Sequence, residues 1–262
     1  MVDTHCHALP GIDDGAKDLE EALALCRIAA ADGIRTLVMT PHVMEFRYPN
    51  DRATIEGAFR TLSGAVEEER IPVSLVRGAE VHAAADLVVR LKEGDLLTYA
   101  DGGRYLLLEF PFQEVVNGTE EIVYRLRLAG VTPVIAHPER IGFFMEDLDR
   151  LRLLTRLGAF GQVTGGSLLG QFGEKSERAA WKMVDQGLVQ IVASDAHDPK
   201  HRPPVLSAAV VALSRQIGED AARRMSDEIP SAILAGQQIE VQQPAAREKG
   251  LRGLFSRFFS RR

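Results

Sequence analysis

The sequence predicts an α/β protein built as a closed, TIM-like barrel of seven parallel strands. Three observations predict this fold class. Short β-rich runs alternate with longer segments of helical periodicity, seven such pairs follow one another, and short glycine-containing returns join them. The apolar strands also suit burial on both faces, as in parallel sheets covered by helices. An open doubly wound sheet is the alternative, although no glycine fingerprint for a dinucleotide accompanies it.

Each expected strand is a short apolar run, and the segment after it repeats apolar residues at helical spacing. In chain order the strands are VDTHC (2–6), RTLVMT (35–40), VSLVRGAE (73–80), RYLLLEF (104–110), TPVIA (132–136), AFGQV (159–163) and LVQIVAS (188–194). The helices that follow them span residues 19–33, 53–69, 84–94, 119–130, 145–158, 174–187 and 203–218. Residues 240–250 have the composition of a linker, so we expect one globular domain over residues 1–239 and a separate tail over residues 240–262.

Composition and charge exclude several classes of protein. The chain has 262 residues, 45% of them hydrophobic, which suits one large soluble domain. No apolar run approaches the roughly 20 residues of a membrane-spanning helix, and the N-terminus reads as a strand, so a cytoplasmic location is expected. Cys6 and Cys26 form no disulfide framework, and neither begins the phosphate loop of a thiol-dependent phosphatase. The net charge is -6, and because residues 247–262 contribute +5 the body of the chain carries -11, which argues against binding of nucleic acid by the body.

Imidazole and carboxylate side chains gather at the carboxyl ends of the expected strands, where the loops of an α/β barrel build its active site. They are His5, His7, Asp13, Asp14, His42, Glu80, Glu109, His137, Asp195 and His197. A lone histidine at a strand end is more often a hydrogen-bonded structural residue, but five of the seven histidines share this position. Residues two apart on a strand face the same side, so His5 and His7 can both face one ion, as can Asp195 and His197. We therefore predict a metal site.

The number and type of these ligands predict a phosphoesterase. Nine ligands, counting one of Asp13 and Asp14, suit two or three ions, and a set of nitrogen and oxygen donors without thiolate suits manganese, iron or zinc. Clustered divalent ions lower the pKa of a bound water and hold phosphoryl oxygens in line for displacement. Arg140 and Arg202 lie on loops beside ligands, and guanidinium groups match phosphate oxygens; pairing with excess carboxylates at the rim is the alternative.

The roles of other side chains near these loops are left open by the sequence. We expect His82 at the surface, and His201 is unassigned beyond being a candidate general acid because of its position beside Arg202. Several aromatic residues offer faces for an aromatic leaving group or pack as a lid, and these are Phe46, Tyr48, Phe112, Phe143 and Phe144.

Eight motifs together resemble a known family. They are HxH in the first strand, the DDG turn, TPH, GAE, LLLEF, AHPER, GSLLGQFG, and ASDAH followed by RPP. This set resembles the polymerase and histidinol phosphatase (PHP) superfamily. Within it, the chain is most similar to the bacterial manganese-dependent protein-tyrosine phosphatases of capsule and exopolysaccharide gene clusters, over residues 1 to about 236. Thr164 stands in the GSLLGQFG region where the family pattern has asparagine.

The resemblance implies a distorted (β/α)7 barrel of the PHP superfamily with three divalent ions, Mn²⁺ first and iron or zinc as alternatives. The ligands it implies are His5, His7, Asp14, His42, Glu80, Glu109, His137, Asp195 and His197. It further implies that Arg140 and Arg202 contact the substrate phosphate, and that the substrate is the phosphorylated tail of a bacterial tyrosine autokinase that regulates capsule or exopolysaccharide synthesis and export. The alternative functions are a small-molecule phosphomonoesterase for histidinol phosphate or a sugar phosphate, a nuclease, and a metal-stabilised binding protein without catalysis.

The end of the chain has a different pattern. Residues 247–262 carry six Lys and Arg residues against Glu248 alone. The apolar residues among them form one helical stripe: Leu251, Leu254, Phe255, Phe258 and Phe259. We expect this tail to contact anionic lipid or a partner, which places the enzyme at the inner face of the plasma membrane; docking on the acidic body is the alternative.

Overall fold

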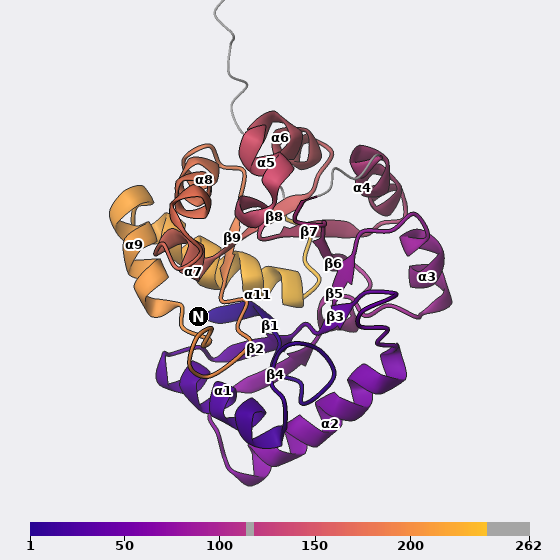
Figure 1. The fold of residues 1–262 in the computed structure, drawn as a ribbon, viewed down its shortest axis with the longest axis vertical. Coiled ribbons are helices and arrows are strands. Elements are labelled where there is room, and N and C mark those ends of the chain that lie inside the picture. The colour runs from indigo at the N-terminus through magenta and orange to yellow at the C-terminus, as the bar shows by residue number, and fades with distance from the viewer. Residues whose placement is uncertain (114–117, 240–262) are drawn as a thin grey trace, which may run out of the picture.

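The computed structural model describes residues 1–113 and 118–239, and strands and helices alternate along this part of the chain (Figure 1). The strands are β1 (Val2–Cys6), β2 (Thr36–Met39), β3 (His42–Val43), β4 (Ser74–Arg77), β5 (Glu80–His82), β6 (Tyr105–Glu109), β7 (Thr132–Ala136), β8 (Phe160–Thr164) and β9 (Ile191–Ala193). The α-helices are α1 (Leu19–Ala31), α2 (Arg52–Glu68), α3 (Leu87–Glu93), α4 (Thr119–Leu128), α5 (Gly142–Glu146), α6 (Leu148–Arg156), α7 (Gly165–Leu168), α8 (Glu174–Asp185), α9 (Ser207–Ile217), α10 (Glu219–Arg223) and α11 (Ile229–Leu234). Short segments of other helix types are η1 (Tyr99–Asp101), η2 (Pro138–Arg140) and η3 (Arg224–Glu228).

The strands form two sheets, and every neighbouring pair in them is parallel. One sheet has the order β1-β2-β4 and the other the order β3-β5-β6-β7-β8-β9. The predicted α/β class with parallel strands is confirmed. The predicted single closed barrel is not what these pairings form, because the strands divide between the two sheets.

The division arises because the predicted second and third strands each break in two. Residues 40–41 separate β2 from β3, and residues 78–79 separate β4 from β5. Pro41 has no N–H to donate to a strand ladder. At Gly78 an added Cβ would lie 3.3 Å from Cγ2 of Thr40, so a side chain there would crowd the neighbouring strand. The first halves, β2 and β4, pair in the small sheet, and the second halves, β3 and β5, pair in the large one.

The segments that follow the first and last strands meet, which brings residues 5–7 beside residues 195–196. Cys6 and Ala196 form an isolated parallel bridge. The Asp195 N–H donates to the His5 carbonyl at 2.9 Å, and the His7 N–H donates to the Ala196 carbonyl at 2.8 Å. This short contact joins the small sheet to the end of the large one.

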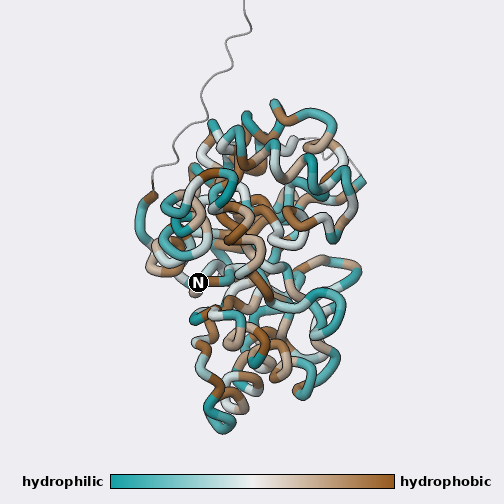
Figure 2. The backbone as a smooth tube through the Cα atoms, turned by 90° about the vertical axis from the view of Figure 1, so that its left-hand side faces the viewer, coloured by the Kyte–Doolittle hydropathy of each residue, from teal (hydrophilic) through white to brown (hydrophobic). Residues whose placement is uncertain are grey.

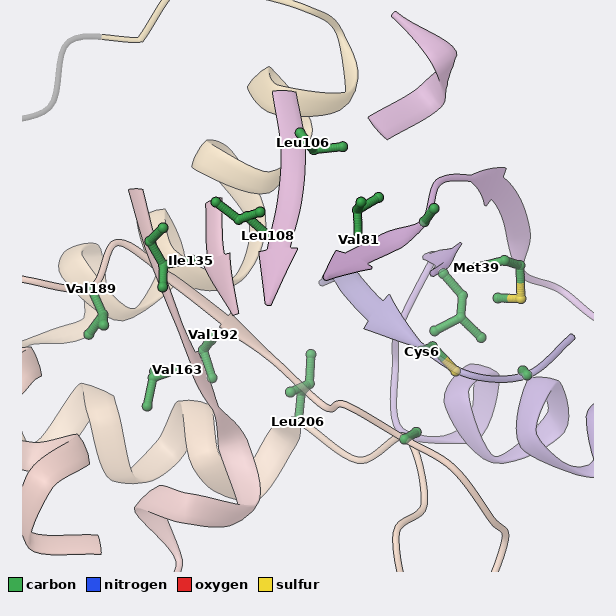
Figure 3. Close-up of a cluster of buried hydrophobic side chains, with 14 of the residues drawn as sticks. Cys6, Met39, Val81, Leu106, Leu108, Ile135, Val163, Val189, Val192 and Leu206 are labelled. Atoms are coloured by element: carbon green, nitrogen blue, oxygen red, sulfur yellow. The ribbon is translucent and has the colours of Figure 1, made fainter. Parts of the chain in front are cut away.

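Both faces of the large sheet are buried, as the apolar strands predict. Figure 2 shows the hydrophobic segments gathered in the interior and many hydrophilic ones on the outer turns. One set of alternating side chains packs in the main core with the surrounding helices, and Figure 3 includes Leu106, Leu108, Ile135, Val163 and Val192 of this set. The side chains between them form a second cluster with Ile233 of α11, and these are Tyr105, Leu107, Val134, Ala136, Phe160 and Ile191. The packing fixes the strand ends that carry the candidate site.

Local capping explains where helices begin. Asp18 precedes α1 and accepts a hydrogen bond from the Glu21 N–H at 2.9 Å, which satisfies a free donor of the first turn. The single helix predicted over residues 145–158 is instead the two helices α5 and α6. Asp147 lies between them in an extended conformation and caps α6 by accepting from the Asp149 N–H at 3.0 Å.

The predicted linker and basic tail, residues 240–262, lie outside the described residues. The domain boundary at residue 239 therefore stays a prediction. None of the helices in residues 1–113 and 118–239 is both long enough and apolar enough to cross a membrane.

Candidate metal centre

All nine predicted metal ligands lie together: seven are at or beyond the carboxyl ends of strands, and His42 and Glu80 begin the short strands β3 and β5 just after the breaks that follow β2 and β4. Eight of them are buried, and Asp14, in the turn after β1, is exposed. Their ring nitrogens and carboxylate oxygens form three overlapping groups, in each of which the ligand atoms lie within 4.8 Å of one another. The groups are His7, Asp14, His42 and His197; His5, His7 and Glu80; and His42, Glu80 and Glu109.

Glu80, the first residue of β5, lies at the middle of the cluster. Its Oε2 is 3.2 Å from His5 Nε2, 3.3 Å from His7 Nε2 and 3.1 Å from His42 Nδ1. Its Oε1 is 3.0 Å from His137 Nε2. Burial alone raises the pKa of Glu80, but the His5 and His42 imidazoles outweigh it and hold that pKa well below its usual range. Glu80 is therefore a carboxylate shared among four imidazoles.

Asp195 forms the second junction of the site. Its Oδ1 lies 3.3 Å from His5 Nε2 and 3.5 Å from His7 Nε2. Its Oδ2 accepts hydrogen bonds from Arg140 and, at 2.5 Å, from Arg202. Burial raises the pKa of Asp195, but these cations and His5 hold it well below its usual range. The geometry thus joins both predicted arginines to the ligand cluster.

The two aspartates of the DDG turn have different positions, which the sequence left open. Asp14 Oδ1 is 3.4 Å from His42 Nε2 and 3.7 Å from His197 Nε2, among the candidate ligands. Asp13 instead lies behind His7, with Oδ2 2.7 Å from His7 Nδ1. This is the usual arrangement of a carboxylate that orients a metal-binding histidine from its far side. Asp13 is a candidate positioning residue for His7, and strand-end spacing alone does not distinguish it from Asp14.

Charge and backbone structure fix the Asp13–His7 pair. Burial lowers the pKa of His7, but Asp13 outweighs it and raises that pKa well above its ordinary value. Asp13 also accepts from the N–H groups of Gly15 at 3.0 Å and His42 at 3.0 Å. An added Cβ on Gly15 would lie 1.8 Å from the His7 carbonyl oxygen, so only glycine fits where the turn passes over the strand. The DDG turn is therefore set against the histidine strand by its own glycine.

Unpaired buried atoms fit a bound cation. Glu80 Oε2 and Glu109 Oε2 are buried without a hydrogen-bond partner among the described residues. Buried carboxylate oxygens without a donor are costly, and a divalent ion is the partner that accounts for several of them converging with imidazoles. Burial and repulsion from His7 lower the pKa of His197 to about 2, so its imidazole is neutral. Cys6, the nearby thiol, belongs to the hydrophobic core, so the donors are nitrogen and oxygen alone.

Two of the candidate ligands have unusual backbone conformations. His137 has φ 32° and Asp195 has φ 53°, both in the left-handed region that residues other than glycine rarely adopt. Each follows the end of a strand, β7 or β9, and turns the chain so that its side chain joins the cluster. Such conformations persist only where the surrounding structure holds them, and they concentrate at functional sites.

An aromatic residue that sequence reasoning missed lies between the two arginines. The guanidinium carbon of Arg140 is 4.3 Å from the centre of the Phe172 ring, and that of Arg202 is 5.6 Å from it. Arg140 also lies 5.2 Å from the ring centre of Phe112. Phe172 belongs to the GSLLGQFG motif, far from either arginine in sequence, so spacing gives no signal of the contact. Both arginines pair with the buried candidate ligand Asp195, and their contact with a phosphate stays a prediction.

A pocket of about 240 Å³ opens above the cluster and is bordered by both arginines. Tyr48 and Phe112 line it: Tyr48 stacks on His42 with ring centres 5.4 Å apart, and Phe112 stacks on His137 at 5.3 Å. The other predicted aromatics do not line this pocket, since Phe143 and Phe144 are buried in the core and Phe46 is exposed.

The two histidines outside the predicted ligand set, His82 and His201, lie in different surroundings. The expectation that His82 is at the surface is wrong, because its half-buried side chain lines the pocket with Nδ1 3.8 Å from Glu109 Oε2. His201 is exposed and is not among the pocket-lining residues. Gln162, which the sequence reasoning also missed, is buried on β8. Its Nε2 lies 3.0 Å from His5 Nδ1, the ring nitrogen that faces away from Glu80, and this contact orients the ring.

A parallel α/β fold in which imidazoles, carboxylates and two arginines converge at the ends of its strands defines the class: a metal-dependent enzyme. The family profile for capsular polysaccharide synthesis, CpsB/CapC, matches residues 1–235. The chain belongs to this family, which confirms the resemblance to the phosphatases of capsule gene clusters.

Individual relatives support the same family assignment. The tyrosine-protein phosphatase YwqE of Bacillus subtilis is 36% identical over 251 residues, covering 95% of this chain and 98% of YwqE. A crystal structure from a study of YwqE from Bacillus subtilis and CpsB from Streptococcus pneumoniae, described as metal-dependent tyrosine phosphatases, superposes with a TM-score of 0.88 at 35% identity, covering 93% of this chain and 98% of that one. A lactonase from Listeria monocytogenes, 14% identical with a TM-score of 0.54, shares the fold over 90% of this chain and 95% of its own.

Proposed function

We propose that this protein is a metal-dependent protein-tyrosine phosphatase, a phosphoric monoester hydrolase. One observation carries the proposal: nine nitrogen and oxygen ligands converge beneath a pocket that two guanidinium groups border. The names of the relatives support phosphotyrosine as the substrate. The isolated bridge between Cys6 and Ala196, which links the two sheets, supports describing the fold as an open, distorted form of a (β/α)7 barrel.

The ligand set favours Mn²⁺, with three ions, and iron or zinc as alternatives. The nine residues that we propose to hold them are His5, His7, Asp14, His42, Glu80, Glu109, His137, Asp195 and His197. When bound, the ions supply Lewis acidity toward the phosphoryl oxygens and lower the pKa of a coordinated water. No thiol nucleophile takes part, since both cysteines are buried.

The residues of the pocket bind and orient the substrate. Arg202 Nε is buried without a hydrogen-bond partner among the described residues, and Asp195 occupies only part of the donor set of each arginine. The remaining N–H donors of Arg140 and Arg202 contact the phosphoryl oxygens and stabilise the charge that develops on them. Tyr48 and Phe112 border the space for the phenyl ring. Tyrosinate, with a parent pKa of about 10, is a moderately good leaving group.

The biological substrate that we propose is the phosphorylated tail of a bacterial tyrosine autokinase that regulates capsule or exopolysaccharide synthesis and export. The family's role in capsular polysaccharide synthesis supports a kinase partner. A cytoplasmic location follows, because such a tail is phosphorylated where ATP is available.

The hydrolysis of a phosphotyrosyl peptide tests the function. The purified protein with Mn²⁺ should release phosphate, lose that activity after treatment with a chelator, and regain it when metal is restored. Histidinol phosphate and a sugar phosphate serve as competing substrates, because a pocket of about 240 Å³ also admits small phosphomonoesters. Higher kcat/KM on these molecules than on the peptide would favour the small-molecule phosphatase. Inactivity on all of them at full metal occupancy would reject phosphatase function.

The basic amphipathic pattern of residues 247–262 supports peripheral attachment to the inner face of the plasma membrane. The full chain should co-sediment with vesicles containing anionic lipid, and binding should weaken as salt is raised. A chain ending at residue 246 should stay in the supernatant. Equal sedimentation of the two chains would exclude a lipid-binding role for the tail.

A further inference from the structure

A second hollow, of about 570 Å³, adjoins the metal pocket. The two share Met44 and His82 in their linings, so they are continuous at that point. We call this second hollow the flanking groove, and its further lining includes Val43, Phe46, Pro49, Ala83, Ala84 and Arg90.

The loop after β3 forms one wall of the flanking groove and is held in a fixed shape. Main-chain hydrogen bonds of 2.9 Å run in both directions between Met44 and Tyr48. Tyr48 in turn stacks on the ligand His42 with an interplanar angle of 9°. The loop is thereby anchored to the metal centre.

This anchored loop presents Phe46 to solvent. The side chain of Phe46 is 93% exposed, more than any other large hydrophobic residue among those described. An aromatic ring displayed on a fixed loop at the edge of a pocket is typical of a contact residue for a partner chain. The other wall carries the small side chains of Ala83 and Ala84, which leave room opposite the loop.

We propose that the flanking groove binds the polypeptide next to the phosphotyrosine, with an apolar side chain of that segment packed between Phe46 and Ala84. This inference rests on the proposed phosphatase function. A phosphotyrosine seated at Arg140 and Arg202 carries its main chain out of the pocket, and the shared Met44 and His82 border leads that chain into the groove. A small phosphate ester uses the metal pocket alone.

The charges of the flanking groove favour particular charges on the peptide segment that it binds. Glu45, Asp51 and Asp86 line it against Arg90. None of these four forms an ion pair with a described residue. The excess of carboxylates favours a neutral or basic flank over an acidic one.

Kinetics on two kinds of substrate test the proposal. Para-nitrophenyl phosphate reports the metal pocket, and phosphotyrosyl peptides with either leucine or glycine on both sides of the phosphotyrosine report the groove. The wild type should prefer the leucine peptide. Phe46→Ala and Ala84→Arg should each raise KM for that peptide about tenfold and remove the preference, with the kinetics of para-nitrophenyl phosphate unchanged. Leu128→Ala, which removes an exposed side chain on α4, is the matched control and should leave both substrates unaffected.

Three results would overturn the proposal: unchanged peptide KM in both groove variants, equal loss on both substrates, or an oligomer that Phe46→Ala dissociates while peptide KM stays the same. The last would make the groove a contact between copies of the chain. If the wild type hydrolyses neither substrate, phosphatase function fails separately. Fluorescence anisotropy with a labelled leucine peptide carrying a non-hydrolysable phosphonate then tests the groove, since binding that Phe46→Ala does not weaken rejects it.

Discussion

Replacing Glu80 with glutamine is expected to lower kcat/KM on a phosphotyrosyl peptide by at least about 10³-fold, with loss of bound metal. Glu80 contacts four imidazoles within 3.0 to 3.3 Å, and it is the carboxylate that belongs to two of the three candidate metal groups. Glutamine keeps the size of the side chain but removes its charge and replaces one oxygen with an amide that donates hydrogen bonds. Metal analysis of the purified variant beside steady-state kinetics measures both effects.

Asp13→Asn provides the matched comparison. Asp13 contacts His7 from the side away from the cluster, so its loss should weaken metal affinity by about 10- to 100-fold without abolishing the site. Raising the metal concentration should restore the activity of Asp13→Asn and not that of Glu80→Gln. Full metal content and normal activity in Glu80→Gln would remove Glu80 from the centre.

Replacing Arg140 with alanine is expected to lower kcat/KM by about 10²- to 10³-fold, raising KM and lowering kcat together, while metal content stays whole. The Arg140 guanidinium reaches the pocket between Phe112 and Phe172 and shares Asp195 with Arg202. Its removal takes away hydrogen-bond donors for the phosphoryl oxygens in both the enzyme–substrate complex and the transition state.

Two further variants interpret the Arg140 result. Arg140→Lys keeps the charge without the planar fork and should recover only part of the activity. Arg178→Ala, which removes an exposed arginine of α8 paired with Glu174, should behave as wild type. Wild-type kinetics in Arg140→Ala would show that the residue only neutralises Asp195.

The alternation of strands and helices was predictable because parallel sheets need apolar runs and covering helices. The division of the strands into two sheets was not predictable, because the strand breaks depend on how residues 40–41 and 78–79 pack against each other across neighbouring strands. A proline or a glycine inside an apolar run is a local signal of irregularity, but it does not tell which sheet the next residues join. The short helices α7, α10 and α11 were also missed, since segments of this length have weak periodicity.

The ligand set was predictable because the carboxyl ends of parallel strands meet at one edge, so strand-end residues converge whatever their distance in sequence. The residues that surround the ligand set were less predictable. The distinction between Asp13 and Asp14, and the contacts of His82 and Phe172, depend on side-chain direction after loops. These loops follow no fixed period, and only the folded chain defines their paths.

The contact between β1 and β9 sets the order in which the site can form during synthesis. Asp3 accepts hydrogen bonds from Ser194, 191 residues later, and the ligands His5 and His7 meet Asp195 at the same junction. A ribosome must therefore complete almost the whole domain before the last ligands reach the first. The candidate metal site can therefore form only late in synthesis. A translation product released before residue 195 lacks Asp195, His197 and Arg202. The fold thus places the assembly of the candidate site after the synthesis of residues up to Arg202.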